Sequence, residues 1–252
     1  MSPVLETRGL TRRFGGVAAV SDLSFSLEEG SVLGVIGPNG AGKSTLINLI
    51  TGHVKPSEGS VLVDGQDVTG ERPWTIARSR VARTFQVVKP FRDLSVRENV
   101  AIGGMFGPER ASSARKAIAQ ADDALERVDL LEKADASPGD LSVADARRLE
   151  LAKALSMQPR LLLLDEVMAG LRPGEIQPAL DLIASLREEG VTILVVEHVM
   201  KAIMAVSDSL LVMHEGAELA RGDPETVMRD ERVIEAYLGQ RYAERARKDR
   251  EG

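Results

Sequence analysis

A glycine-rich segment with the sequence GPNGAGKST, at residues 37–45, constrains the fold of this chain more than any other feature. The apolar run SVLGVIG (31–37) precedes it, and KSTLINLITG (43–52), which has the pattern of a helix closed by Gly52, follows it. The spacing G-x-x-x-x-G-K-[ST] between a buried strand and a helix is typical of a phosphate-binding loop. An ordinary glycine turn into a helix is the alternative, and the match of both motif and context disfavours it.

The chemistry of this loop follows from its residue types. Glycines let the backbone curl so that its N–H groups point at phosphate oxygens, and the helix N-terminus adds a partial positive charge. Lys43 places a positive charge against the β- and γ-phosphates, and the Ser44 hydroxyl can ligate Mg²⁺. The motif alone leaves the nucleotide and the reaction open. The nucleotide-binding residues expected here are Asn39, Gly40, Ala41, Gly42, Lys43, Ser44 and Thr45.

Two acidic residues, Asp165 and Glu166, end the apolar run LLLLDE (161–166). Ligands of open α/β sheets bind at the carboxyl ends of strands, so the pair falls at the expected edge. Consecutive side chains of a strand diverge, so the two carboxylates can have different roles. We expect Asp165 to support the Mg²⁺ shell and Glu166 to orient or deprotonate the attacking water. A solvated acidic strand end is the alternative.

His198 follows the apolar run VTILVVE (191–197), at the end of the next strand in the sequence. A histidine taken alone is more often structural, and His53 and His214 have the pattern of turn or surface residues. His198 differs because it also falls at a carboxyl edge, where a side chain can reach the γ-phosphate. We therefore predict a catalytic role for it.

Residues 141–155, LSVADARRLELAKAL, have the pattern of a helix with a capped start. Ser142 can accept hydrogen bonds from free backbone N–H groups, and Asp145 lies where the helix dipole favours a negative charge. Apolar residues recur from Leu149 at roughly helical spacing. Two interpretations stay open: a packed helix and nothing more, or a helix whose N-terminus forms half of a nucleotide site.

The order of the predicted elements places the chain in the α/β class. The N-terminal third combines antiparallel strands, including a hairpin over 60–68 with an Asp64–Gly65 turn, with the strand–loop–helix unit. A region rich in Ala, Arg, Glu and Leu follows, with helical patterns such as 111–134. Strands and helices then alternate, which predicts a parallel sheet covered by helices. The last helix is expected over about 225–239, after the helix-breaking Pro224.

We expect the fold of a P-loop NTPase, with a RecA-like parallel sheet, an N-terminal antiparallel β subdomain and an inserted helical subdomain. Residues 1–252 would form one domain. Its nucleotide-binding core with the antiparallel arm would span 1–89 and 159–240, the helical subdomain 90–158, and a charged C-terminal tail 241–252.

Composition excludes several function classes. A net charge of −6, from 38 acidic and 32 basic residues, argues against a nucleic-acid-binding surface along the whole chain. The chain has no cysteine, which removes disulfides and Cys-ligated metal sites and fits a reducing cytosol. The N-terminus lacks the apolar region of a signal peptide, and the longest apolar runs fall far short of the ~20 residues that a membrane span needs. Any membrane role is therefore expected to come through a partner.

These features together resemble the ATP-binding cassette (ABC) ATPases, from about residue 4 to Gly239. Besides the phosphate loop, LLLLDE and the strand-end histidine, RTFQ (83–86) ends in Gln86 where that family has its glutamine loop. Phe14, in LTRRFGG, falls where an aromatic side chain stacks on adenine. LSVAD (141–145) falls at the start of the family's signature helix. The resemblance thus implies that this helix start completes a site with the phosphate loop of another subunit.

The resemblance assigns roles to these residues, with ATP as the nucleotide and Mg²⁺ as the cofactor. Ser142 would contact the ATP held by the other subunit. Catalysis would involve Lys43, Gln86, Glu166 and His198, and the Mg²⁺ shell would involve Ser44, Gln86 and Asp165.

Within the family, VARTFQVVKPFRDLSVRENV, DEVMAGLRPGE and the closing RGDPETVMRDERVIEAYLG look most like the ATPase subunits of branched-chain amino-acid importers, a group that includes urea and amide importers. This implies a head-to-tail dimer with a second ATPase subunit, at the cytoplasmic face of the inner membrane. The dimer would dock on two permeases that are fed by a periplasmic binding protein. The groove for a permease helix would involve Val87, Val88, Phe91 and Leu94, with simple packing of the helical insertion as the alternative.

Several positions depart from the family pattern. Val143 and Ala144 replace glycines of the usual LSGGQ signature, and Asp145 would place a negative charge near the partner's triphosphate, which Arg147 and Arg148 would offset. Three further departures are Val167, Arg172 and Val199. We therefore expect a division of labour, in which this chain's phosphate loop forms a competent site and its LSVAD completes a weaker one.

Three other functions stay open at this point. An export-type cassette for lipid or lipopolysaccharide shares an ending like RVIEAYLG. Soluble cassette ATPases of translation or DNA repair usually carry two cassettes or a long coiled-coil insertion, and this chain has neither. A weakly hydrolysing, nucleotide-dependent regulatory cassette is suggested only by the altered signature.

Overall fold

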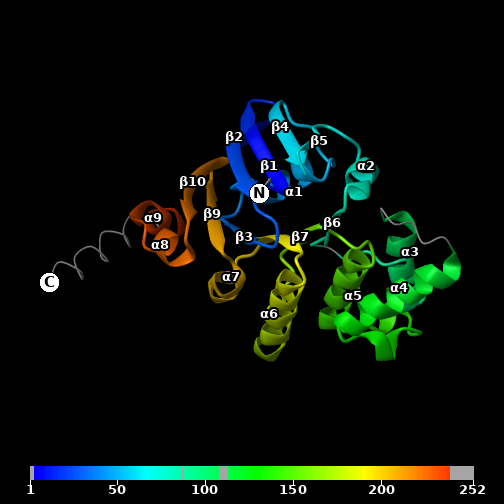
Figure 1. The fold of residues 1–252 in the computed structure, drawn as a ribbon. Helices are drawn as coiled ribbons and strands as arrows, with labels where there is room; N and C mark the ends of the chain where they lie inside the picture. Colours follow the sequence, from blue (N-terminus) through cyan, green and yellow to red (C-terminus); the bar gives the residue numbers. More distant parts are fainter. Residues whose placement is uncertain (1–2, 87, 108–112, 239–252) are drawn as a thin grey trace.

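The computed structural model describes residues 3–86, 88–107 and 113–238, which form two β-sheets with helices packed on both sides of the larger one (Figure 1). The smaller sheet has the strand order β2-β1-β4-β5, and the larger has the order β10-β9-β3-β8-β7-β6. Among the helices of the described ranges, none has the length and apolar character that a bilayer crossing requires.

The smaller sheet is antiparallel and lies in the N-terminal part of the chain. In β2, the buried side chains of Leu23, Phe25 and Leu27 alternate with exposed ones, so one face of the sheet packs on the core. Asp64 and Gly65, both with positive φ, form the predicted turn between its last two strands. The strands are β1 (Leu5–Phe14), β2 (Val17–Leu27), β4 (Glu58–Val63) and β5 (Gln66–Asp67).

The larger sheet confirms the predicted parallel core. Five adjacent strands run parallel, and β10 pairs antiparallel with β9 at one edge. The short edge strands β6 and β10 have no continuous apolar run, and the sequence did not predict them. The strands are β3 (Val32–Ile36), β6 (Val81–Arg83), β7 (Leu161–Asp165), β8 (Thr192–Val196), β9 (Ser209–His214) and β10 (Ala217–Gly222).

Alternate side chains of the parallel strands enter two separate cores. On β7, Leu161 and Leu163 pack with helix α1 (Lys43–Ile50) and with the smaller sheet. Leu162 and Leu164 point the other way, toward helices α6 and α7 and the helical region. Both faces are therefore covered, which explains why these strands are apolar without interruption. Helix α6 spans Pro173–Glu188, and α7 spans Met200–Val206.

Three helices form a separate group beside the sheet edge that carries β6 (Figure 1). They are α3 (Val96–Phe106), α4 (Ala114–Arg127) and α5 (Val143–Leu155), and they pack on one another through buried residues such as Val100, Leu125 and Leu149. Ser95 and Glu98 form a capping box at the start of α3. Short 3₁₀ turns at Leu131–Lys133 and Pro138–Asp140 lead into α5, and α2 (Pro73–Arg78) precedes β6.

Two predicted helices differ from the structure. Helix α4 covers only part of the predicted 111–134, because Asp129 has positive φ and the chain leaves the helix there. The last predicted helix is two helices, α8 (Pro224–Met228) and α9 (Glu231–Leu238). Asp230 divides them because its carboxylate accepts a hydrogen bond from the Arg232 N–H at 2.9 Å and so starts a new helix.

Candidate nucleotide-binding site

The candidate site lies along one edge of the larger sheet. Because β3, β8, β7 and β6 are adjacent and parallel, the segments that follow them meet at their carboxyl ends. The phosphate loop follows β3, His198 follows β8, Glu166 follows β7 and Gln86 follows β6. The topology thus places four separate parts of the sequence side by side at the carboxyl ends of these strands.

The phosphate loop owes its shape to close backbone packing. Gly42 has φ of 101°, and a Cβ atom there would lie 2.2 Å from the carbonyl oxygen of Ala19 in β2. At Gly37 a Cβ would lie 2.2 Å from the Met213 carbonyl oxygen of β9. Helix α1 begins at Lys43, so the amides of its first turn have no acceptor within the helix and face the loop. The loop therefore presents backbone donors to an anion, as the motif predicts.

Lys43 folds back over the loop that precedes it. Its Nζ atom donates to the carbonyl oxygens of Gly37 at 2.7 Å and Pro38 at 3.0 Å. Burial lowers the pKa of the Lys43 ammonium, and the nearby carboxylates of Glu166 and Asp165 act in the opposite direction. The ammonium thus lies between the phosphate loop and the acidic pair.

Gln86 and Glu166, predicted from separate motifs, are joined directly. The Gln86 Nε2 atom donates to Glu166 Oε2 at 2.6 Å. Glu166 has a φ of 51°, a left-handed conformation that costs a non-glycine residue on the order of 1–3 kcal/mol. Its backbone N–H donates to the carbonyl oxygen of Val196 at the end of β8. Neighbouring strands therefore fix the strained backbone that aims this carboxylate.

Asp165 is buried, and its two carboxylate oxygens differ. Oδ2 lies 3.4 Å from a guanidinium nitrogen of Arg83, while Oδ1 is buried and has no hydrogen-bond partner. Burial raises the pKa of Asp165, and the Arg83 charge counteracts this effect. The carboxylate shares a pocket of about 450 Å³ with Ser44 and Gln86.

The oxygens in this pocket fit a magnesium ion. Mg²⁺ is typically bound by one or two carboxylates together with substrate phosphates and water. The described residues hold no group of three or more His, Cys, Asp or Glu side chains that could form a complete metal site. The hydroxyl of Ser44 and the unpartnered Oδ1 of Asp165 are the kind of incomplete shell that an incoming nucleotide–magnesium complex would fill.

His198 is at the predicted edge, but its side chain is 59% exposed. Across the described part of the chain, no hydrogen bond joins it to Lys43, Gln86 or the acidic pair. The residue before it, Glu197, is 1% exposed and accepts a hydrogen bond at 2.7 Å from the backbone N–H of Met168. Burial raises the pKa of Glu197. Glu197 was not among the predicted site residues, although a charged residue that ends a buried strand is a signal for one.

Phe14 lies at the end of β1, in the hairpin whose second strand packs against the phosphate loop. It pairs with Val17 across the hairpin, and the residue is 47% exposed. The guanidinium of Arg12 lies 4.5 Å from the ring centroid. The exposed ring area is available for stacking on a planar ligand.

Ser142 caps helix α5 as predicted. Its Oγ accepts from the Asp145 N–H at 3.1 Å and donates to Asp145 Oδ2 at 2.8 Å. The Asp145 carboxylate also binds the Lys133 ammonium at 2.6 Å and lies 3.8 Å from Arg148. Asp145 is 7% exposed, and Arg148 lies near it as expected, but Lys133 takes the place expected for Arg147.

We expect Ser142→Ala to have only a small effect on ATP hydrolysis, because the backbone donors of α5 remain. It removes the helix cap and should lower the free energy of unfolding by about 1 kcal/mol. Urea unfolding and steady-state ATPase assays on the same preparation measure both quantities. A loss of hydrolysis as large as that caused by removing the Lys43 ammonium would contradict this expectation.

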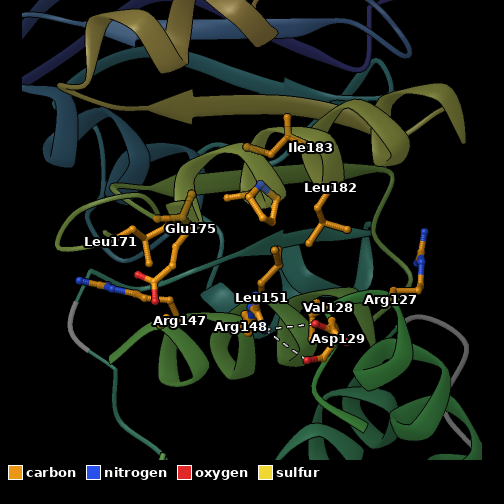
Figure 2. Close-up of a pocket in the computed structure, with 14 residues that line it drawn as sticks. Arg127, Val128, Asp129, Arg147, Arg148, Leu151, Leu171, Glu175, Leu182 and Ile183 are labelled. Carbon is orange, nitrogen blue, oxygen red and sulfur yellow. Dashed lines mark hydrogen bonds and ion pairs between the residues drawn. The ribbon is translucent and has the colours of Figure 1, made fainter. Parts of the chain in front are cut away.

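Arg147, the neighbour of this cap, contacts the glutamine loop. One guanidinium nitrogen donates to the backbone carbonyl oxygens of Phe85 and Gln86. Arg147 and Arg148 lie at the rim of an apolar crevice between α5 and α6, where Arg148 is joined to Asp129 (Figure 2). The start of α5 is thus attached to the loop that carries a candidate catalytic residue. No sequence signal indicated this attachment.

Comparison with known proteins places the chain among transport proteins. Residues 20–169 match a family described as ABC transporter, and residues 218–243 match one described as branched-chain amino acid ATP-binding cassette transporter. The chain is 42% identical to the high-affinity branched-chain amino acid transport ATP-binding protein BraF of Pseudomonas aeruginosa and 41% identical to its counterpart LivG of Escherichia coli. Both alignments cover 94% of this chain and 98% of the relative.

Solved structures similar to this chain are also ATP-binding cassettes of ABC transporters. A nucleotide-free ATP-binding cassette from an ABC transporter is 31% identical, with a TM-score of 0.85 over 94% of this chain and 100% of that one. An ATP-binding cassette of an ABC transporter in its ADP conformation also has a TM-score of 0.85 at 31% identity, over 95% and 100% of the two chains.

Proposed function

Because the chain belongs to the ABC transporter family, we propose that it is the ATP-hydrolysing subunit of an importer for branched-chain or related amino acids. The observation that carries this proposal is the likeness to branched-chain relatives along nearly the whole chain, including the separate match over residues 218–243. An export-type cassette, a soluble repair or translation ATPase and a regulatory cassette are not favoured by these relatives.

In the proposed reaction the phosphate loop holds the triphosphate of ATP. The backbone amides at the start of α1 and the Lys43 ammonium would bind the β- and γ-phosphates, for which Lys43 must exchange its present carbonyl acceptors. Phe14 would stack on the adenine. Ser44, Asp165 and Gln86 would hold Mg²⁺, which would neutralise charge on the phosphates when bound.

Glu166 would orient or deprotonate the attacking water. Its Oε2 atom accepts a hydrogen bond from the Gln86 amide, so opening this bond would free that oxygen to act on a water. ATP that draws Gln86 toward the metal would free Glu166 at the same time. His198 would reach the γ-phosphate from β8, the strand between the phosphate loop and the acidic pair.

The second half of each site would come from another ATPase subunit in a head-to-tail dimer. Ser142 would contact the partner's ATP. Because Lys133 and Arg148 neutralise Asp145, this carboxylate would repel that ATP less than the sequence suggested. The two sites of the dimer would differ in activity. This chain's phosphate loop would form the competent site, and its altered signature LSVAD would complete the weaker one.

A groove beside the glutamine loop would receive a cytoplasmic helix of a permease. It has a volume of about 280 Å³ and is lined by apolar side chains of α2 and β6 together with Phe85 and Met157. Trp74, which lines it, is 56% exposed, and Phe91, farther along the loop, is also exposed but lines a different pocket. Val88 and Leu94 are partly buried, and Val87 lies outside the described residues. Exposed aromatic side chains are typical of protein interfaces.

Reconstitution with its partners tests the proposed function. The chain should co-purify with a second cassette and two permease subunits when they are expressed together. In vesicles, ATP hydrolysis should rise when the binding protein is loaded with leucine, isoleucine or valine. The same vesicles with the binding protein incubated with histidine serve as the control. Stimulation by a lipid substrate, or hydrolysis that no amino acid changes, would reject the importer proposal.

A further inference from the structure

Arg83, in the edge strand β6, is a buried cation whose contacts reach three parts of the candidate site. Its side chain is 10% exposed. One guanidinium nitrogen donates to Asn48 Oδ1 at 2.7 Å and Thr51 Oγ1 at 3.2 Å, both on or next to helix α1. The second terminal nitrogen lies 3.4 Å from Asp165 Oδ2, Nε donates to the Thr84 carbonyl oxygen at 3.3 Å, and the guanidinium carbon lies 4.6 Å from the Phe85 ring centroid.

These contacts constrain how the Asp165 carboxylate can rotate. With Oδ2 held by Arg83, Oδ1 is the oxygen that has no partner, although it is buried. Buried polar atoms in proteins are nearly always hydrogen-bonded or ligated. Ser44 and Asp165 line the same pocket, and Arg83 lines it too. The unpartnered oxygen is therefore free to accept a ligand.

The same guanidinium also joins helix α1 to the residue that precedes Gln86. Helix α1 carries Lys43 and Ser44, and Phe85 immediately precedes Gln86. A guanidinium can form several hydrogen bonds in a plane while its face stacks on an aromatic ring, whereas a lysine ammonium cannot do both. The residue type therefore matches the geometry.

We propose that Arg83 is a positioning residue that presets the Asp165 carboxylate for Mg²⁺ and links it to α1 and the glutamine loop. This inference rests on the proposed function, since it assumes that ATP binds with Mg²⁺. Arg83 would contact neither the nucleotide nor the metal. Its removal should therefore weaken metal binding far more than it weakens nucleotide binding.

The test compares ATP binding to the full-length chain in Mg²⁺ and in EDTA by calorimetry, with Mn²⁺ binding in the presence of ATP followed by electron paramagnetic resonance. For Arg83→Met we expect ATP affinity in EDTA to stay near that of the wild type. Mn²⁺ affinity should fall roughly 10-fold or more, the usual effect of losing an outer-shell partner. Arg83→Lys, which keeps the charge, should give an intermediate loss.

Two further variants keep the test decisive. Asn48→Ala removes the shortest hydrogen bond of Arg83 and should lower Mn²⁺ affinity in the same direction, so it replaces Arg83→Met if that variant does not fold. Arg160→Met is the matched control. Arg160 does not line this pocket, and it forms partly exposed ion pairs of 3.1 Å with Glu29 and with Asp64. It should leave both affinities unchanged.

The outcomes separate the inference from the function on which it rests. Equal losses in EDTA and in Mg²⁺, or unchanged Mn²⁺ affinity in folded Arg83 and Asn48 variants, would overturn the positioning role. A wild-type chain that binds no ATP with Mg²⁺ would instead reject the proposed function itself.

Discussion

Lys43→Ala should abolish ATP hydrolysis, with kcat at least about 100-fold lower, the usual scale for losing a group that stabilises charge in a transition state. The Lys43 ammonium lies between the phosphate loop and the two carboxylates, where burial has already removed part of its hydration. It can therefore transfer to phosphate oxygens at low desolvation cost. Steady-state phosphate release from the assembled transporter measures the effect.

The control for this prediction is Lys116→Ala, because Lys116 is exposed on α4. That variant should hydrolyse ATP at the wild-type rate. The affinity for ATP should also fall in Lys43→Ala, since the same charge binds the ground state. Hydrolysis within a few-fold of the wild type would show that the ammonium does not act on the phosphates.

Glu166→Gln should retain ATP binding while hydrolysis falls by roughly 100-fold or more, the contribution typical of a general base. Glutamine has nearly the same shape and still fits the strained turn, but it cannot take a proton from water. ATP would then stay bound, so the head-to-tail dimer should persist. Rapid-quench assays together with sedimentation of the ATP-bound sample measure both effects.

Glu126→Gln, an exposed glutamate of α4, is the matched control and should change neither quantity. If Glu166→Gln turned over ATP at the wild-type rate, the water would have to be activated elsewhere, with His198 the next group to test. If the variant bound no ATP, Glu166 would be needed for nucleotide binding by the phosphate loop and not for activation of the water.

The strands whose carboxyl ends form the candidate site could be predicted from the sequence because the signal for each strand is local. Buried on both faces, β3, β7 and β8 are apolar without interruption, and a parallel arrangement then brings the residues after them together. The loop GPNGAGKST and the pair after β7 could be placed on the same grounds. The short edge strands could not, because three or six mixed residues carry no periodic pattern.

The hydrogen bonds and ion pairs between side chains of the site could not be predicted from the sequence, for a different reason. The Gln86–Glu166 bond and the Arg83–Asp165 ion pair join residues about eighty positions apart, and no local pattern encodes such a choice. Asp145 shows the same limit. Its place in the first turn of α5 was predictable, but its pairing with Lys133 depends on the 3₁₀ turn at Leu131–Lys133.

The central proposal is that the phosphate loop holds a magnesium-bound triphosphate beside Asp165 and Glu166. Calorimetric titration of ATP into the wild-type chain and into Lys43→Ala, each with and without Mg²⁺, tests it directly. We predict saturable, one-to-one binding that Mg²⁺ strengthens in the wild type and that is lost or greatly weakened in the variant. No binding by the wild type, or equal binding by the two proteins, would contradict the account.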